Sequence, residues 1–174
     1  MALVIALAVN NGFKNTLERN LLGAMAHINV MEKEPLYGIE NWRDMAARLR
    51  KLPHVTDVAP AIYTPALLVG GLQPKYVVLK GVDVATETAI SDSLRHLKAG
   101  SLDRLRDPNA NPPGIVLGSG IVEDTAMKLN SRIAAYFQSG ELTPFGPRMT
   151  NRPFRVSGVF ESGFFELEIG RAVV

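Results

Sequence analysis

Apolar side chains open the chain without interruption and then recur at a helical spacing. Residues 2–9 (ALVIALAV) are all apolar, and Phe13, Leu17 and Leu21 follow at four-residue intervals. This spacing predicts that the apolar run continues as a helix to residue 25. The run is too short to cross a bilayer, which takes about 20 apolar residues, and it lacks the basic start and cleavage site of a signal peptide. Two interpretations stay open: a buried N-terminal helix or strand, and the trailing end of a transmembrane helix.

The rest of the chain interleaves patterns typical of strands and of helices. Gly70-Gly71 and Pro74 separate two strand-like runs and predict a hairpin. The strands are expected at 27–31, in two pieces within 55–69 broken at Pro60 and Pro65, and at 75–80, 115–117, 132–137, 154–160 and 172–174. Helices are expected at 42–52, at 86–99 with Gly100 as its stop, and after Ser119. Interleaved elements with hairpins predict the α+β class with mixed or antiparallel pairing.

The segment 42–52 predicts an amphipathic helix with Asn41 as its N-cap and Pro53 as its stop. Its apolar stripe consists of Trp42, Met45, Ala46, Leu49 and Leu52. Packing of this stripe on a sheet is favoured over a position on a membrane surface.

The composition indicates the class of protein but does not indicate a particular reaction or ligand. The 174 residues are 47% apolar and 21% charged, with a formal net charge of +2, which is typical of a folded globular domain. Lys and Arg are spread along the chain, which argues against a nucleic-acid partner. The chain has no cysteine, which excludes disulfides, zinc–thiolate sites and a cysteine nucleophile.

The motifs of catalytic and cofactor sites are missing from the sequence. His27, His54 and His96 have no second ligand at metal-binding spacing. Residues 117–120 (LGSG) follow a strand, but they lack the further residues of a nucleotide-binding loop and instead predict a helix capped by Ser119. The acidic residues Glu123, Asp124, Glu166 and Glu168 are expected to be solvated. We therefore predict no catalytic, cofactor-binding or metal-binding residue in this chain, and no enzymatic activity.

Residues 138–149 form a segment that is too apolar for a simple solvated turn. The sequence TPFGP lies at its centre, and the flanking strands predict a hairpin with this sequence at its tip. Prolines stiffen such a tip and lower the ordering cost of binding. The residues alone leave two alternatives of equal weight: Phe145 is presented to a partner, or it folds back and is buried.

Several segments together resemble the lipoprotein-releasing ABC-transporter permeases of the LolC/LolE type, within the superfamily of MacB-like periplasmic domains. The first is AVNNGFKNTLERNLLGAMAHINV, which resembles the exit from the first transmembrane helix of these permeases. The strand VVLKGVD (77–83) and, in outline, residues 115–133 follow. The most specific is TPFGPRMTNRPFRVSGVFESGFFELEIGRAVV (143–174). Where the family has Gly-Asp, this chain has Asn130-Ser131, and asparagine tolerates the left-handed backbone that glycine would supply.

This resemblance implies an α+β MacB-like periplasmic fold with two subdomains. Residues 13–85 and 154–174 would form a porter-like subdomain that contains a βαβ unit. Residues 86–153 would form an inserted, β-rich sabre-like subdomain. Residues 1–12 would be the end of a truncated transmembrane helix or a leading helix, and the domain would face the periplasm from the inner membrane.

The resemblance also implies a function without bond chemistry in this chain. A separate cytoplasmic ATPase subunit would bind ATP, and a second permease subunit would complete the transporter. A lipoprotein client would then pass to a periplasmic carrier that is held by a protruding hairpin. Trp42 and the strand that bears Phe154 and Phe160 would belong to the hydrophobic core. The carrier-contacting candidates are Leu142, Thr143, Pro144, Phe145, Gly146, Pro147, Arg148 and Arg152.

Two other functions compete with this one. The first is a MacB-like efflux or mechanotransmission permease domain without a lipoprotein client. The second is a free-standing periplasmic binding module. For a lipoprotein-releasing permease, both the carrier-recruiting and the lipoprotein-contacting subunit fit the pattern.

Overall fold

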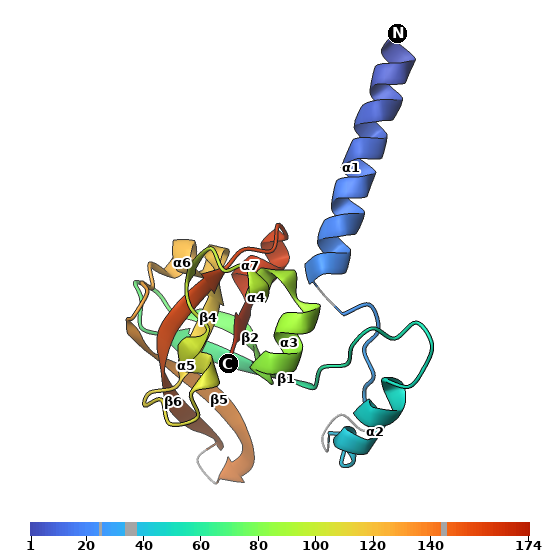
Figure 1. Ribbon diagram of the computed structural model, residues 1–174. Coiled ribbons are helices and arrows are strands. Elements are labelled where there is room, and N and C mark those ends of the chain that lie inside the picture. Colours follow the sequence, from blue (N-terminus) through green and yellow to red (C-terminus); the bar gives the residue numbers. More distant parts are fainter. Residues whose placement is uncertain (25, 34–37, 144–145) are drawn as a thin grey trace.

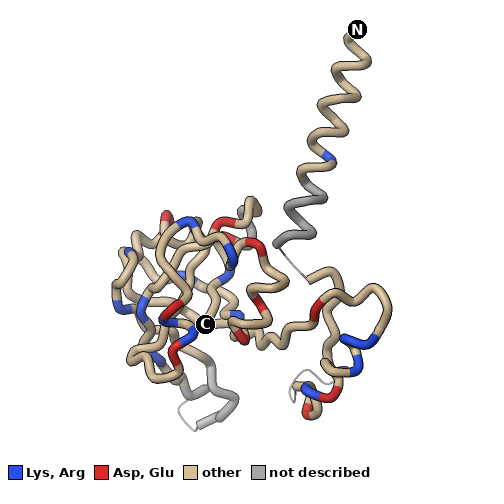
Figure 2. Tube along the Cα trace, in the orientation of Figure 1, with Lys and Arg blue, Asp and Glu red and all other residues tan. Residues whose placement is uncertain are grey.

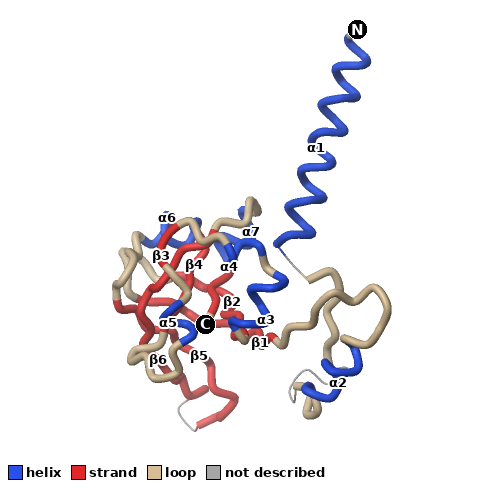
Figure 3. Tube along the Cα trace, in the orientation of Figure 1, coloured by secondary structure: helices blue, strands red, loops and turns tan. Residues whose placement is uncertain are grey.

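The computed structural model describes residues 1–24, 26–33, 38–143 and 146–174. Side chains are described for all of these except 17–24, 138–143, 146–148 and 165–166. Helices and strands both contribute to the fold, which confirms the predicted α+β class (Figures 1 and 3).

The strands form one sheet that closes on itself. The seven strands are β1 (Ala61–Val69), β2 (Lys75–Val82), β3 (Ala99–Gly100), β4 (Gly114–Gly118), β5 (Arg132–Thr143), β6 (Gly146–Phe160) and β7 (Arg171–Val173). They pair in the order β3-β6-β4-β7-β2-β1-β5, and β5 pairs with β6 as well. Six strands therefore form a closed, mixed barrel, and the short β3 attaches to β6 outside this ring.

Most of the helices surround this barrel or extend from it, and α2 lies apart from it. They are α1 (Ala2–Ala24), α2 (Trp42–Leu49), α3 (Val84–Ile90), α4 (Asp92–Arg95), α5 (Asp103–Arg106), α6 (Ser119–Thr125) and α7 (Phe165–Gly170). In Figure 1, α3, α4 and α5 lie on the side of the barrel, and α6 and α7 lie at one end.

Alternate residues of the strands point into the barrel and fill it. Its core combines strand residues with Ile121 and Met127, which belong to α6 and the segment after it. The inward strand residues are Ala66, Leu68, Val77, Leu79, Ile115, Leu117, Ile133, Ala135, Phe154, Val156 and Ala172. A second cluster lies outside the barrel wall, where Leu94 and Leu102 pack on Val116, Phe160 and Val173. Phe154 and Phe160 are buried as predicted, at 6% and 4% exposure.

The predicted hairpin around Gly70-Gly71 is confirmed as the antiparallel pair β1–β2. A Cβ on Gly71 would lie 2.1 Å from the carbonyl oxygen of Thr125, so the turn needs a glycine where it meets α6. One prediction about β1 was wrong, because the strand runs unbroken through Pro65. Pro65 is tolerated because β1 pairs with β5 only from Leu67 onwards, so the preceding part of that edge needs no proline N–H.

The helix α1 extends from the barrel as one continuous rod, and its far end carries the N-terminus (Figure 1). The predicted continuation of the apolar run as a helix is therefore confirmed. Its first half exposes apolar side chains, including Leu3 at 73%, Ile5 at 64% and Phe13 at 64%. Among the described residues, no helix has the length and hydropathy that a membrane span requires.

Two predictions for the segment after α1 were wrong. Residues 27–31 form no strand, and α2 lies apart from the barrel (Figure 1). Trp42 is 38% exposed rather than in the core, and the Arg43 guanidinium lies 4.5 Å from its ring centroid. The end of α2 is instead joined to the segment that leads to β1, because Arg50 donates a 2.7 Å hydrogen bond to the carbonyl of Val58. Local contacts therefore replace the expected packing on the sheet.

The single helix predicted at 86–99 is divided. Ser91 has extended backbone angles between α3 and α4, and the chain after His96 turns into β3. Gly100, predicted as a stop, has φ +84, and a Cβ there would lie 2.2 Å from the carbonyl oxygen of Ser157. The apolar face predicted for this segment is confirmed, because Leu94 is buried and Leu97 packs beside it. The prediction of one unbroken helix was wrong, because the chain is extended at Ser91.

Strands from both predicted subdomains share the one barrel. β1, β2 and β7 come from the porter-like ranges, β4 and β5 come from the sabre-like range, and β6 crosses the boundary at residue 154. The division into 13–85 with 154–174 and 86–153 stays a prediction.

Candidate functional site

The long hairpin β5–β6 is the first candidate site. Near the barrel, residues 134–136 of β5 pair with β1, and β6 pairs with β4 from Arg155 onwards. Between these points the two strands pair with each other, from Phe137↔Thr150 to Thr143↔Gly146. The hairpin therefore extends beyond the closed barrel, as Figure 1 shows.

The predicted contact residues lie at the end of this hairpin. Leu142 pairs with Pro147 and Thr143 with Gly146, so the predicted hairpin around the TPFGP sequence is confirmed for the backbone. Pro144 and Phe145 lie outside the described residues, and the side chains of Leu142, Thr143, Gly146, Pro147 and Arg148 are not described. The choice between a presented and a buried Phe145 stays open.

The described part of the hairpin arm is solvent-exposed along β6. Residues 149–153 are all exposed, with Met149 at 61%. Arg152 lies opposite Ala135 and is exposed. This arm thus presents an apolar side chain and a cation to solvent, which are groups that protein interfaces favour.

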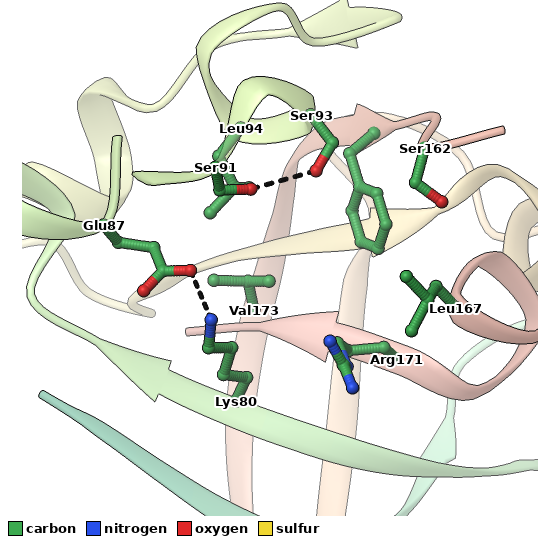
Figure 4. Close-up of a pocket in the computed structure, with 10 residues that line it drawn as sticks. Lys80, Glu87, Ser91, Ser93, Leu94, Ser162, Leu167, Arg171 and Val173 are labelled. Atoms are coloured by element: carbon green, nitrogen blue, oxygen red, sulfur yellow. Dashed lines mark hydrogen bonds and ion pairs between the residues drawn. The ribbon is translucent and has the colours of Figure 1, made fainter. Parts of the chain in front are cut away.

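A small pocket between α3–α4 and β7 is the second candidate site (Figure 4). Its volume is about 20 Å³, which is room for one water molecule. Its lining residues are Lys80, Glu87, Ser91, Ser93, Leu94, Phe160, Ser162, Leu167, Arg171 and Val173. Sequence reasoning missed this pocket, because its residues come from five separate segments with no shared motif.

Lys80 and Glu87 form an ion pair in the wall of this pocket. Their side chains are 13% and 5% exposed, and the Lys80 ammonium donates a hydrogen bond to the Glu87 carboxylate. The pair joins the barrel strand β2 to α3. Tyr63 on β1 lies near the same cation, with its ring centroid 5.9 Å from Lys80 Nζ and 5.7 Å from the Arg171 guanidinium carbon.

Glu168 was expected to be solvated, but the structure gives it four hydrogen-bond donors. Its Oε1 accepts 2.8 Å bonds from the backbone amides of Ser162 and Gly163, and the Ser162 hydroxyl approaches within 3.3 Å. Its Oε2 accepts a 2.9 Å bond from the Ser119 hydroxyl. Burial is the largest single influence and opposes ionisation, yet these bonds together hold the pKa of Glu168 below its usual value.

These contacts give the LGSG sequence (117–120) a structural role that does not require binding of a phosphate. The N-cap of α6 is Gly118, and Ser119 donates to Glu168 rather than capping the helix, so the predicted Ser119 cap was wrong. A Cβ on Gly118 would lie 2.2 Å from the Glu168 carbonyl oxygen, and one on Gly120 would lie 2.5 Å from Ile169 Cγ2. The glycines therefore allow α7 to pack directly on this turn.

An open groove of about 460 Å³ lies beside α6. Val122, Met127 and Leu129 contribute apolar side chains to it, and Lys98 stands at its rim. Lys98 donates a 2.6 Å hydrogen bond to Glu161, and that bond raises the pKa of the lysine. The groove is mainly apolar, and Ser119, Glu123 and Lys128 line it as well.

The described residues offer no group of three or more potential metal ligands. All three histidines are exposed. Lys, Arg, Asp and Glu are interspersed along the chain trace (Figure 2).

Comparisons with known proteins identify the family of this chain. The model of the MacB-like periplasmic core domain family matches residues 1–173. The lipoprotein-releasing system transmembrane protein LolC of Xylella fastidiosa is 31% identical over 174 residues, covering 99% of this chain and 40% of that protein. LolE of Haemophilus influenzae is 24% identical over 161 residues, covering 90% of this chain and 37% of that protein.

A solved structure, the periplasmic region of MacB from Actinobacillus actinomycetemcomitans, covers 84% of this chain and 56% of its own chain at 18% identity, with a TM-score of 0.49. The chain spans about 40% of the length of the curated LolC relatives it matches. The resemblance to LolC/LolE-type permeases noted in the sequence is confirmed over nearly the whole chain. The family match over residues 1–173 shows that this chain belongs to the MacB-like periplasmic core domain family.

Proposed function

We propose that this chain is the extracytoplasmic domain of an ABC-transporter permease subunit that releases lipoproteins from the inner membrane. This proposal rests on the similarity to LolC and LolE proteins over 90–99% of the chain, together with the family match. In this proposal the domain faces the periplasm and performs no bond chemistry. A separate cytoplasmic ATPase subunit hydrolyses ATP, and a second permease subunit completes the membrane part.

The helix α1 would connect the domain to the membrane. Its first residues carry no charge, and Leu3, Val4, Ile5, Leu7 and Val9 are each at least 54% exposed. Exposed apolar side chains around a helix suit a hydrocarbon environment rather than water. At its other end α1 contacts α4, so movement of the helix would reach the layer that covers β7 and β4.

The hairpin β5–β6 would hold the periplasmic carrier during hand-over of the lipoprotein. Its position supports this role, because its described backbone extends beyond a closed barrel. Its composition supports the role too, since Met149 and Arg152 are exposed on one arm. The tip residues 142–148 add two prolines, which lower the ordering cost of binding.

The direct test replaces residues 138–149 with a two-residue turn in the full-length permease and measures capture of the purified carrier. We expect capture to be lost while the transporter still assembles with its ATPase. Unchanged capture would refute the carrier-holding role and would favour an efflux or mechanotransmission permease.

Two matched pairs of point variants refine this test. Met149→Asp changes an exposed apolar residue of the arm, and Leu72→Asp makes the same change at an 87% exposed position in the β1–β2 turn. Arg152→Glu and Arg106→Glu likewise reverse exposed charges on the arm and on α5. We expect only the two hairpin variants to weaken capture, by at least about tenfold if the residues are interface anchors.

A further inference from the structure

The pocket between α3–α4 and β7 combines charged, hydroxyl and apolar groups around one small space. Figure 4 shows Arg171 on β7 and Lys80 on β2 on one side, and Ser91 and Ser93 on the other. A few convergent polar groups over an apolar wall are the usual form of a ligand site. Phe160 lies at the barrel end of β6, and none of the lining residues lies in the arm at 137–153, so the pocket is separate from the proposed carrier contact.

The charges of this pocket do not cancel. Lys80 and Glu87 pair with each other and together contribute no net charge. Arg171 faces the ring of Tyr63 at 5.7 Å, but no carboxylate of the described side chains lies within ion-pair distance of its guanidinium. The pocket therefore keeps one positive charge, with guanidinium donors that a planar anion can engage in pairs.

A hydroxyl proton is also available. The Ser91 and Ser93 hydroxyl oxygens lie 3.0 Å apart and share one hydrogen bond. Because each hydroxyl has one proton and one of them is used in this bond, the other proton remains for a ligand. The Ser162 hydroxyl does not add a donor, since it already contacts Glu168 and the backbone at residue 164.

The apolar wall makes these donors more effective. Leu94, Phe160 and Val173 are each no more than 4% exposed. Hydrogen bonds and charge contacts beside such buried apolar groups act in a lower effective dielectric than water. The volume of about 20 Å³ is room for one carboxylate oxygen in place of a water molecule, and the remainder of the ligand would lie outside.

We propose that this pocket binds a single carboxylate group, through the Arg171 guanidinium and the Ser91–Ser93 hydroxyl pair. The planar carboxylate matches the fork of the guanidinium and accepts the remaining hydroxyl proton. The carboxylate is that of a free small acid or of an acidic side chain on a protein that docks over α3 and α4. The buried Lys80–Glu87 pair holds the pocket wall and does not bind the ligand.

The test uses the whole chain, with binding followed by NMR shifts of the Arg171 and Ser93 signals. The probes are sodium acetate and a capped tripeptide with a central glutamate, each at constant ionic strength, with sodium chloride as the reference. We expect a saturable shift with acetate. A response to the peptide as well assigns the site to an acidic side chain, and a response to acetate alone assigns it to a free acid.

Variants separate binding from general charge effects. Arg171→Gln is expected to weaken binding at least about tenfold, as loss of a charge-assisted bond does, and Ser93→Ala to weaken it less. Arg106→Gln, which removes an exposed arginine on α5, should leave binding unchanged. Equal shifts with chloride and acetate, or binding that survives in a folded Arg171→Gln variant, would overturn the proposal. If Arg171→Gln does not fold, unchanged binding by a folded Ser91→Ala, Ser93→Ala double variant would overturn it.

Discussion

The ion pair between Lys80 and Glu87 gives the sharpest prediction about stability. It joins the barrel to α3 in a place where the two side chains are only 13% and 5% exposed. Removing one member of a buried pair leaves the other without its partner, at a cost of about 3–5 kcal/mol. Because Lys80 keeps some contact with solvent, we expect Glu87→Gln to lower the free energy of unfolding by about 3 kcal/mol, at the lower end of that range.

A double variant shows whether the loss of stability comes from the unpaired charge or from lost packing. Converting both residues, as Lys80→Met with Glu87→Gln, removes the isolated charge along with the pair. We expect the double variant to recover at least about 1 kcal/mol relative to the sum of the two single variants. An additive double variant would contradict the account of the pair.

Urea unfolding followed by circular dichroism measures these changes as shifts of the midpoint at constant slope. The exposed pair Lys98–Glu161, with side chains 45% and 52% exposed, is the matched control. Because exposed pairs contribute little, Glu161→Gln should leave the urea midpoint almost unchanged. A loss below about 1 kcal/mol for Glu87→Gln as well would refute the reasoning.

Three further predictions concern backbone strain, close packing and pH. Ala126 ends α6 in the left-handed conformation (φ 56), so Ala126→Gly should stabilise the fold by roughly 0.5–1 kcal/mol in urea unfolding; a loss would contradict the strain. Gly118→Ala should destabilise by about 1–3 kcal/mol because its Cβ would meet the Glu168 carbonyl, whereas Gly12→Ala, with open space around it, should not destabilise. The depressed pKa of Glu168 contributes stability that is present above its unfolded value and is lost as pH falls through the folded value. Unfolding measured between neutral pH and pH below about 4 should therefore show a loss that Glu168→Gln lacks, and an identical pH profile would contradict the role of this carboxylate.

The sequence predicted the elements whose signals are local. The Gly70-Gly71 hairpin, the strand at 115–117 and the helix through residue 24 all appear where turn residues and apolar spacing placed them. Asn130 has φ 64, as expected of the residue that replaces the family's glycine. The hairpin tip at 142–147 was likewise predicted from its prolines and glycines.

The errors arose where distant contacts decide the structure. The stripe of Trp42 and its neighbours indicated a helix correctly, but spacing cannot say which surface that helix contacts. The sequence predicts a solvated Glu168, because the donors that hold it, at Ser119 and residues 162–163, come from other segments. The barrel closure between β5 and β1 and the pocket at Arg171 depend on pairings that no local pattern encodes.

The most direct test of the central claim is site-specific photocrosslinking in the full-length permease with the periplasmic carrier present. A photoreactive residue at position 149, on the exposed hairpin arm, should crosslink to the carrier, and the same residue at position 72 should not. Crosslinking at 72 alone, or at neither position while the transporter releases lipoprotein to the carrier, would contradict the hairpin as the docking site.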